Sequence, residues 1–348
     1  MVSSGGMMRP TVHDIAAAAG VSLATVDRVL NQRPGVRHVT REKVETAIRE
    51  LGYVRDVAAA NLAKGRTYPL VFILPASDNS FMYGLNAEIR QAALRSPAER
   101  TDIRTIEVPA FDPAALVSVL EGLSQEKPCG IALVATDAPE VRAAVDRLVR
   151  ERFPIVTLVS DLTGSLRHHY AGVDNIAAGR TAARLLGRFL GRRKGEIAVL
   201  AGSMLVRDHR ERLEGFSAVM AEEFPDLAIL PVLEGRDDPE VAHMLVADAL
   251  SRNAGIIGVY SLGAGNRGLI RALKEKAVDR ILTVIAHELT AHTRAALIDN
   301  TIDAILNQDA GHEVRSAIRV LKAKADGLAV IEAQERIRLD IFLKDNLP

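Results

Sequence analysis

The segment 11–31 limits what this chain can fold into more than any other part, because it reads as two short helices joined by a three-residue turn. Thr11 followed by Asp14 predicts a capped start for the first helix, and Gly20 predicts its left-handed end. Ser22 predicts the cap of the second helix. This pattern is typical of a helix-turn-helix, a shape that fits the major groove of DNA.

Apolar side chains at helical spacing predict one small three-helix core around this segment. A third helix is expected to begin at a Thr40 cap and to end at Gly52. The residues expected to face the core are Ile15, Val21, Val26, Leu30, Val44, Ile48 and Leu51. Together they predict a helical head at the start of the chain.

The outer face of the second helix carries Leu23, Ala24 and Arg28. Arg28 can pair with O6 and N7 of a guanine, which discriminates between bases by roughly 1–3 kcal/mol. Leu23 and Ala24 offer only apolar contact, for instance to a thymine methyl group. An ordinary pair of helices with a solvated Arg28 remains the alternative at this point.

The distribution of charge supports a local DNA contact, although the chain as a whole is neutral. Residues 1–67 carry ten Lys and Arg against six Asp and Glu, so the rest of the chain has the opposite excess. A basic head on an acidic body suits phosphate contact through the head alone. Residues 1–10 contain no apolar signal core and are expected to be disordered, and no stretch approaches about 18 consecutive apolar residues, so we expect a cytoplasmic protein.

From Leu70 onward, short β-rich runs alternate with amphipathic helical segments. This alternation predicts parallel sheets with right-handed crossovers, and so long a stretch exceeds what one sheet usually holds. We therefore expect two doubly wound lobes. The expected strands are 70–74, 102–108, 130–135, 155–159, 197–201, 228–233, 256–260, 281–286 and 303–306.

Ligands of such folds bind at the carboxyl ends of the strands, so polar residues in the loops there are expected to converge on one cleft. Between head and body, residues 55–67 have helical propensity but little to bury. A helix of about ten residues is not stable alone in water, so this linker is expected to fold only against a partner such as DNA.

The order of head, conditional helix and two-lobed body resembles the lactose-repressor (LacI/GalR) family of ligand-controlled transcription factors. The match is most specific in Asp14-Ile15-Ala16, Ala19-Gly20-Val21-Ser22, Thr25-Val26, Arg28-Val29-Leu30-Asn31, Thr40-Arg41 and Leu51-Gly52-Tyr53. The resemblance implies an all-α helix-turn-helix head with a hinge helix, followed by an α/β two-lobed body like a periplasmic binding protein, with parallel doubly wound sheets.

The resemblance also implies domain boundaries. After the N-terminal residues 1–10, the DNA-binding domain would span 11–54 and the hinge 55–67. The effector-binding and dimerisation domain would span 68–348. Its first lobe would comprise about 68–175 and 307–332, and its second lobe about 176–306 and 333–348.

By this resemblance, Leu23, Ala24 and Arg28 would read bases. The phosphate-contacting positions would be Thr11, Ser22, Thr25, Asn31 and Thr40. Ala59 and Leu62 would form a wedge in the minor groove, where inserted apolar side chains unstack a base step and bend the duplex; a plain apolar linker residue is the alternative for Leu62. Asp27 stands where the family commonly has a serine. Its carboxylate would either accept a hydrogen bond from a cytosine amine or pair with Arg33.

The run Arg210-Glu211-Arg212-Leu213-Glu214-Gly215-Phe216 resembles the family segment that carries a ligand-clamping arginine, and Arg210 is assigned that role. A guanidinium can bind vicinal hydroxyls or a carboxylate through two parallel hydrogen bonds. The alternative is that Arg210 is an ordinary surface arginine. The other expected effector contacts are Phe81, Asp161, Asn266, Glu288 and Gln308, with Asp174 a weaker candidate. A core phenylalanine is the alternative for Phe81, and Asn266 stands in for an Asn-Asp pair that the family usually has in this loop.

Two patterns favour other functions. Gly263-Ala264-Gly265-Asn266-Arg267-Gly268 matches a dinucleotide fingerprint, but it lies far from the first strand of the body. His287 and His292 are five residues apart, where a zinc helix needs four. We therefore expect no catalytic residues, cofactor or metal, and keep an NAD-binding enzyme and a periplasmic-type solute-binding protein as alternatives.

The expected function is a homodimeric repressor that binds a pseudo-palindromic DNA operator and responds to a sugar, a polyol or a sugar derivative. No partner membrane is expected. Residues 335–348 lack a leucine heptad, so we expect dimers without a helical tetramer tail. The effector's identity and the direction of its effect on DNA binding stay open.

Overall fold

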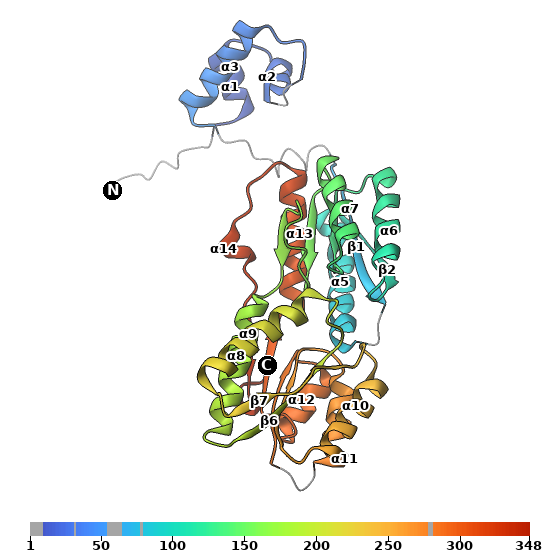
Figure 1. Cartoon of the computed structure of the whole chain (residues 1–348). Coiled ribbons are helices and arrows are strands. Elements are labelled where there is room, and N and C mark those ends of the chain that lie inside the picture. The colour runs from blue at the N-terminus through green and yellow to red at the C-terminus, as the bar shows by residue number, and fades with distance from the viewer. Residues whose placement is uncertain (1–9, 31–32, 54–64, 77–78, 278–280) are drawn as a thin grey trace, which may run out of the picture. The chain divides into compact units, whose positions relative to one another are not determined.

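The computed structural model describes residues 10–30, 33–53, 65–76, 79–277 and 281–348. The chain divides into two compact units, Met1–Arg66 and Thr67–Pro348, called here the head and the body (Figure 1). Within the described ranges, no helix is both long and apolar enough to cross a membrane.

The head consists of three helices, α1 (Val12–Ala19), α2 (Leu23–Leu30) and α3 (His38–Leu51). Thr11 and Asp14 form a capping box, with Thr11 N donating to Asp14 Oδ2 over 2.7 Å. Gly20 ends α1 with a φ of 63°, and Ser22 Oγ accepts from Thr25 N over 3.3 Å. The local signals that predicted two helices and a turn are thus confirmed.

The third helix starts earlier than the sequence suggested. Arg37 O accepts from both Thr40 N and Arg41 N over 3.0 Å, so the first turn is already closed at His38. Thr40 therefore lies within α3 and does not cap it, which corrects the expected start. The buried core consists of Ile15, Val26, Val29, Val44 and Ala47, and the expected core residues Val21, Leu30, Ile48 and Leu51 are only partly buried around it.

The first lobe of the body contains five parallel strands in the order β2-β1-β3-β4-β5. Its elements are β1 (Tyr68–Ala76), α5 (Ser80–Glu99), β2 (Thr101–Pro109), α6 (Pro113–Glu126), β3 (Gly130–Leu133), α7 (Pro139–Arg150), β4 (Ile155–Leu158), β5 (His169–Ala171) and α13 (Ala310–Ala325). Helices α5 and α13 pack on one face of the sheet, and α6 and α7 pack on the other.

The second lobe contains a sheet in the order β12-β11-β10-β9-β6-β7, with β8 also paired to β6. Its elements are α8 (Asn175–Leu190), β6 (Gly195–Ala201), α9 (Arg207–Glu223), β7 (Leu227–Ile229), β8 (Leu233–Glu234), α10 (Pro239–Arg252), β9 (Ile256–Ser261), α11 (Asn266–Lys276), β10 (Thr283–His287), α12 (Ala291–Ile298), β11 (Ala304–Gln308) and β12 (Leu339–Phe342). Helices α8 and α9 cover one face, and α10, α11 and α12 cover the other.

Three details of the strands differ from the expectation. The run 228–233 forms two short strands, β7 and β8, because Pro231 between them has no N–H to donate to a sheet. Strands β5 and β12 were not expected, since each has at most four residues and gives a weak period-two signal. β12 pairs antiparallel with β11 at the edge of its sheet.

The chain passes between the lobes several times. After β11 in the second lobe, α13 packs against α5 and the sheet of the first lobe, and β12 then returns to the second lobe (Figure 1). The carboxyl ends of β1, β3 and β4 and those of β6, β9 and β10 lead into loops that line a common cleft. The two-lobed parallel α/β architecture expected from the sequence is confirmed.

Candidate functional site

The second helix of the head presents a solvent-facing surface. Leu23 is 42% exposed, and Ala24, Asp27 and Arg28 are exposed beside it. Arg33 Nη1 donates to Asp27 Oδ2 over 3.3 Å, which is one of the two alternatives considered for Asp27. This pairing neutralises an acid that would otherwise repel phosphate.

The expected phosphate-contacting residues lie at helix starts or on helix surfaces. Thr11 and Ser22 are exposed, Thr25 and Thr40 are half-buried, and Ser22 Oγ lies 3.0 Å from Thr25 Oγ1. Asn31, Ala59 and Leu62 lie outside the described residues.

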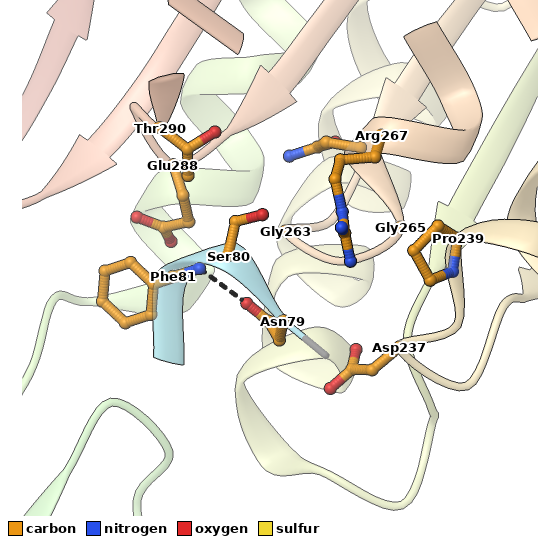
Figure 2. Close-up of a pocket in the computed structure, with 11 residues that line it drawn as sticks. Asn79, Ser80, Phe81, Asp237, Pro239, Gly263, Gly265, Arg267, Glu288 and Thr290 are labelled. Carbon is orange, nitrogen blue, oxygen red and sulfur yellow. Dashed lines mark hydrogen bonds between the residues drawn. The ribbon is translucent and has the colours of Figure 1, made fainter. Parts of the chain in front are cut away.

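The body contains a cleft between its lobes, with two adjoining compartments. The first compartment is lined by Asn79, Ser80, Phe81, Asp237, Pro239, Gly263, Gly265, Asn266, Arg267, Glu288 and Thr290 (Figure 2). The second compartment includes Met82, Thr136, Ser160, Asp208 and His209 in its lining. Asn79 and Asp237 line both compartments, so each compartment takes residues from both lobes.

A buried ion pair between Arg212 and Glu288 lies behind the first compartment. Arg212 is 1% exposed and Glu288 is 2% exposed, and Nη2 donates to Oε1 over 3.3 Å. Arg212 also donates to Asn175 Oδ1 over 2.8 Å and to Leu262 O over 2.7 Å. Glu288 accepts a further bond from Gln308 Nε2 over 2.9 Å. The guanidinium is thus locked in one orientation, with Glu288 as its partner at the edge of the cleft.

This network continues into the first lobe. Asn175 Nδ2 donates to Tyr170 Oη over 3.1 Å, and Tyr170 Oη donates to Val159 O over 2.7 Å. Arg212 therefore connects, through two side chains, the second-lobe cleft wall to the end of β4.

The structure separates the two arginines of α9. Arg212 shares the buried face of α9 with Asp208, Gly215 and Phe216, which are spaced at three to four residues, whereas Arg210 is half a turn away. In the described part of the chain neither Arg210 nor Arg212 lines a compartment, but Arg212 pairs with Glu288, which lines the first one. The helical phase of Phe216 and Gly215 was the sequence signal that would have selected Arg212.

Arg210 instead joins the lobes at the rim. Its guanidinium donates to Asp137 Oδ2 in the first lobe and to Met204 O over 3.1 Å. Arg207 Nη1 lies 3.6 Å from the same oxygen, and Arg142 of the first lobe donates to the other oxygen of Asp137. Asp137 therefore forms ion pairs with two arginines from the opposite lobe.

The remaining expected effector residues lie in different places. Phe81 lines the first compartment and also packs in the core of the first lobe, so both interpretations of it fit. Asn266 lines the same compartment, where its Nδ2 donates to His287 O over 2.8 Å. Gln308 reaches the site through Glu288. Phe81, Asn266, Glu288 and Gln308 are thus brought together.

Asp161 is engaged within its own lobe. Its carboxylate accepts from Thr157 Oγ1 and Thr163 Oγ1, each over 2.9 Å, and from the guanidinium of Arg167. Burial acts to raise the pKa of Asp161, but the hydrogen bonds from Arg167, Thr157 and Thr163 and the charge of Arg167 together outweigh it, and the pKa lies below the ordinary value. The weaker candidate Asp174 caps α8 by accepting from Ala177 N over 2.9 Å.

The glycine-rich run 263–268 has a structural explanation. A Cβ on Gly263, whose φ is 129°, would lie 2.7 Å from Arg212 Nη1, and a Cβ on Gly268 would lie 2.1 Å from Pro239 O. Gly263 thus leaves room for the Arg212 side chain, and Gly268 allows α10 and α11 to pack closely. Among the described residues, no group of three or more His, Cys, Asp or Glu side chains is placed to hold a metal ion.

A further buried acid lies next to this network. Glu313 of α13 is fully buried, and neither of its carboxyl oxygens has a hydrogen-bond partner within the described ranges. Burial, followed by the nearby charge of Glu288, raises the pKa of Glu313 well above its ordinary value. Burial also raises the pKa of Glu288, although Arg212 counteracts it. No sequence signal identified Glu313.

Two family matches together span most of the chain. Residues 70–329 match the family described as "Periplasmic binding protein domain", and residues 11–56 match "Bacterial regulatory proteins, lacI family".

Curated relatives align over a large share of the chain. The HTH-type transcriptional regulator DegA of Bacillus subtilis is 27% identical over 249 residues, which cover 71% of this chain and 71% of that protein. The ribose operon repressor of Escherichia coli is 29% identical over 212 residues, 60% of this chain and 61% of that protein.

Solved structures resemble the body. An ABC transporter solute-binding protein from Burkholderia graminis, in complex with D-arabinose, is 22% identical with a TM-score of 0.73, and the match covers 80% of this chain and 96% of that chain. The XylFII-LytSN complex is 19% identical with a TM-score of 0.72, covering 81% and 100%. At these identities the likeness shows the fold alone.

Proposed function

Because the chain belongs to the lacI family of bacterial regulatory proteins, with a body of the periplasmic binding protein domain family, and is a ligand-responsive DNA-binding transcription regulator, we propose that it acts as a homodimer on a pseudo-palindromic operator. The relatives are regulators, and the chain is not an enzyme. Its DNA affinity would be switched by a small sugar-like effector bound between the lobes of the body.

The observation that carries this proposal is the cleft lined from both lobes around the Arg212–Glu288 pair. A ligand that touches both lobes has a different affinity for their closed and open arrangements, which is the requirement for shifting a conformational equilibrium. A differential affinity of about 1–3 kcal/mol would change operator binding about 5–150-fold.

On the DNA side, the exposed surface of α2 supports base reading by Leu23, Ala24 and Arg28. We assign phosphate contacts to Thr11, Ser22, Thr25, Asn31 and Thr40, and the minor-groove wedge to Ala59 and Leu62. The Asp27–Arg33 pair is expected to keep the acid away from phosphate.

On the effector side, we assign the cleft contacts to Phe81, Arg212, Asn266, Glu288 and Gln308. Arg212 takes the clamping role expected of Arg210, because it is the arginine of α9 that faces Glu288. Arg210 and Asp161 already have their own ionic partners, Asp137 and Arg167. An effector hydroxyl pair would replace the bond between Arg212 and Glu288 with bonds to the ligand.

Self-association is supported by two exposed apolar side chains on α5. Tyr83 is 58% exposed and Leu94 is 74% exposed, and their spacing of three helical turns puts them on one side of the helix. Tyr83 borders a groove that also includes His292 at α12 and Phe342 at β12. A second copy packed along α5 would cover this side of both lobes.

Selection of operator DNA from random sequence by the full chain tests the DNA half of the proposal. We expect two half-sites related by a pseudo-dyad. Arg28→Ala is expected to lose discrimination at one base pair of each half-site while keeping nonspecific binding. Arg49→Ala, which removes an exposed arginine from the end of α3, is the charge-matched control. Equal losses of Arg28→Ala on operator and on random DNA would refute base reading.

Displacement of the selected operator by sugars and polyols tests the effector half. Arg212→Lys is expected to abolish the response while leaving operator affinity unchanged, because a lysine cannot supply the three directed bonds of the guanidinium. Arg210→Lys is the control on the same helix and should keep the response. A full response in Arg212→Lys would remove Arg212 from the site.

A further inference from the structure

The cleft between the lobes is rich in carboxylates and poor in cations. Asp208 and Asp237 line the second compartment, and Asp237 also lines the first. The basic side chains lining the described part of the cleft are Arg267 and His209, and His209 Nε2 lies 3.8 Å from Asp208 Oδ2. Arg212 does not change this balance, since its charge is matched by Glu288.

Asp237 is held at the junction of the two compartments by its backbone and by a neighbouring glycine. Arg236 and Asp237 both have left-handed conformations, with φ values of 51° and 60°. A Cβ on Gly202 would lie 2.3 Å from Asp237 Oδ1, so only a glycine leaves room for this carboxylate. The chain thus places an acid where the two halves of the cleft meet, and Figure 2 shows this acid in the lining of the first compartment.

One oxygen of this carboxylate lacks a partner. Asp237 Oδ1 is buried and receives no hydrogen bond from the described residues, while Asn79 of the first lobe bonds to the Asp237 side chain. Glu313, fully buried, also has two unpartnered oxygens, and it is close enough to Glu288 and Asp208 to feel both charges. Among the described residues, the acids beside the cleft therefore keep carboxyl oxygens that no donor satisfies.

A neutral hydroxyl group would donate one hydrogen bond to Asp237 but would leave the negative charges uncompensated. A protonated amine offers three donors and a positive charge, and charge-assisted bonds are about twice as strong as neutral ones. Carboxylates concentrated in a cleft with low-dielectric walls also raise the local concentration of cations.

We propose that the effector of this cleft carries a protonated amino group, and that the carboxylates of Asp237 and Asp208 bind it. The inference rests on the proposed effector site and specifies the chemistry that the site selects. Asp237 is the specificity-determining residue, because it faces both compartments.

Calorimetric and thermal-shift titrations of the full chain with matched sugars test this proposal. The probes are glucose, galactose and mannose, their 2-amino forms, and their N-acetylated 2-amino forms, in which the charge is removed. We expect at least one amino sugar to bind about tenfold or more tightly than its hydroxyl and N-acetyl counterparts.

Asp237→Asn should reduce that preference to less than about threefold. Asparagine tolerates the left-handed backbone at this position, so the loop should keep its shape. Asp238→Asn is the matched control: Asp238 caps α10 by accepting from Glu240 N over 2.7 Å, and asparagine caps equally well. This control should leave the preference for the amine unchanged.

Neutral sugars that bind as tightly as the amines, a preference that persists in Asp237→Asn, or an amine panel without any binding would each overturn the inference. Release of the operator by a neutral sugar would leave the proposed function standing while refuting the amine. Failure of the chain to select any operator would refute the proposed function itself, whichever sugar binds.

Discussion

Replacing Arg212 by methionine removes the cation of the buried pair and takes one donor away from each of three acceptors. Two of them, Asn175 Oδ1 and Leu262 O, are neutral and lie 2.8 and 2.7 Å from the guanidinium. Each unsatisfied buried acceptor costs about 1–3 kcal/mol. The third, Glu288, keeps its bond from Gln308 over 2.9 Å but loses its counter-ion.

Glu288 can take up a proton, which limits the free-energy cost of losing its counter-ion. Protonating a glutamate of ordinary pKa costs about 4 kcal/mol at pH 7 and about 1 kcal/mol at pH 5. We therefore expect Arg212→Met to lower the free energy of unfolding by about 3–5 kcal/mol at pH 7, the usual range for breaking a buried pair. The loss should shrink by roughly 2–3 kcal/mol at pH 5.

The sign of this pH dependence follows from the direction of the pKa shift. Burial raises the pKa of Glu288 in the folded state, and loss of Arg212 raises it further. A carboxyl whose folded-state pKa is raised stabilises the fold fully at acid pH and loses that contribution as pH rises through the folded-state pKa. Arg212→Met/Glu288→Gln removes the titrating group, so this double variant should recover stability at pH 7 and lose the extra pH dependence.

Urea unfolding of the full chain, followed by tyrosine fluorescence at pH 5 and pH 7, measures these differences. The chain has no tryptophan, and four of its five tyrosines belong to the body. Arg210→Met is the control: its side chain is 40% exposed, and Asp137 keeps Arg142, so the loss should be under about 1 kcal/mol. A loss below about 1 kcal/mol for Arg212→Met, or one independent of pH, would refute the reasoning.

Three further perturbations test other parts of the structure. Burial raises the pKa of Glu313, so Glu313→Gln should match the wild type in urea unfolding near pH 4 and exceed it near pH 8; equal stability at both values contradicts the assignment. Gly215→Ala should cost about 1–3 kcal/mol in the same assay, because its Cβ would meet Ile176 O at 2.1 Å, and a neutral effect would mean that α8 and α9 pack less closely. Thr11→Ala should cost the head about 1 kcal/mol in thermal unfolding by circular dichroism, whereas Thr11→Ser should not, and equal stability of the two variants would deny the capping box a role.

The sequence by itself determined the local elements of the head. Thr11, Asp14, Gly20 and Ser22 act on backbone groups within four residues of their own positions, so their effect on helix ends does not depend on the rest of the chain. The alternation of strands and helices likewise determined two parallel α/β lobes. The expected cap at Thr40 was wrong because the start of α3 depends on which residues first close a helical turn. No side-chain cap marks that start.

Tertiary structure alone decided the partners of the charged residues. Arg210 and Arg212 have the same chemistry and similar neighbours in sequence, and only the packing of α9 directs Arg212 to Glu288 and Arg210 to Asp137. The burial of Glu313 and the position of Asp237 over Gly202 depend on segments that are far apart in the chain. A local pattern determines backbone conformation through short-range hydrogen bonds, whereas the environment of an ionisable group is determined by whatever the fold brings against it.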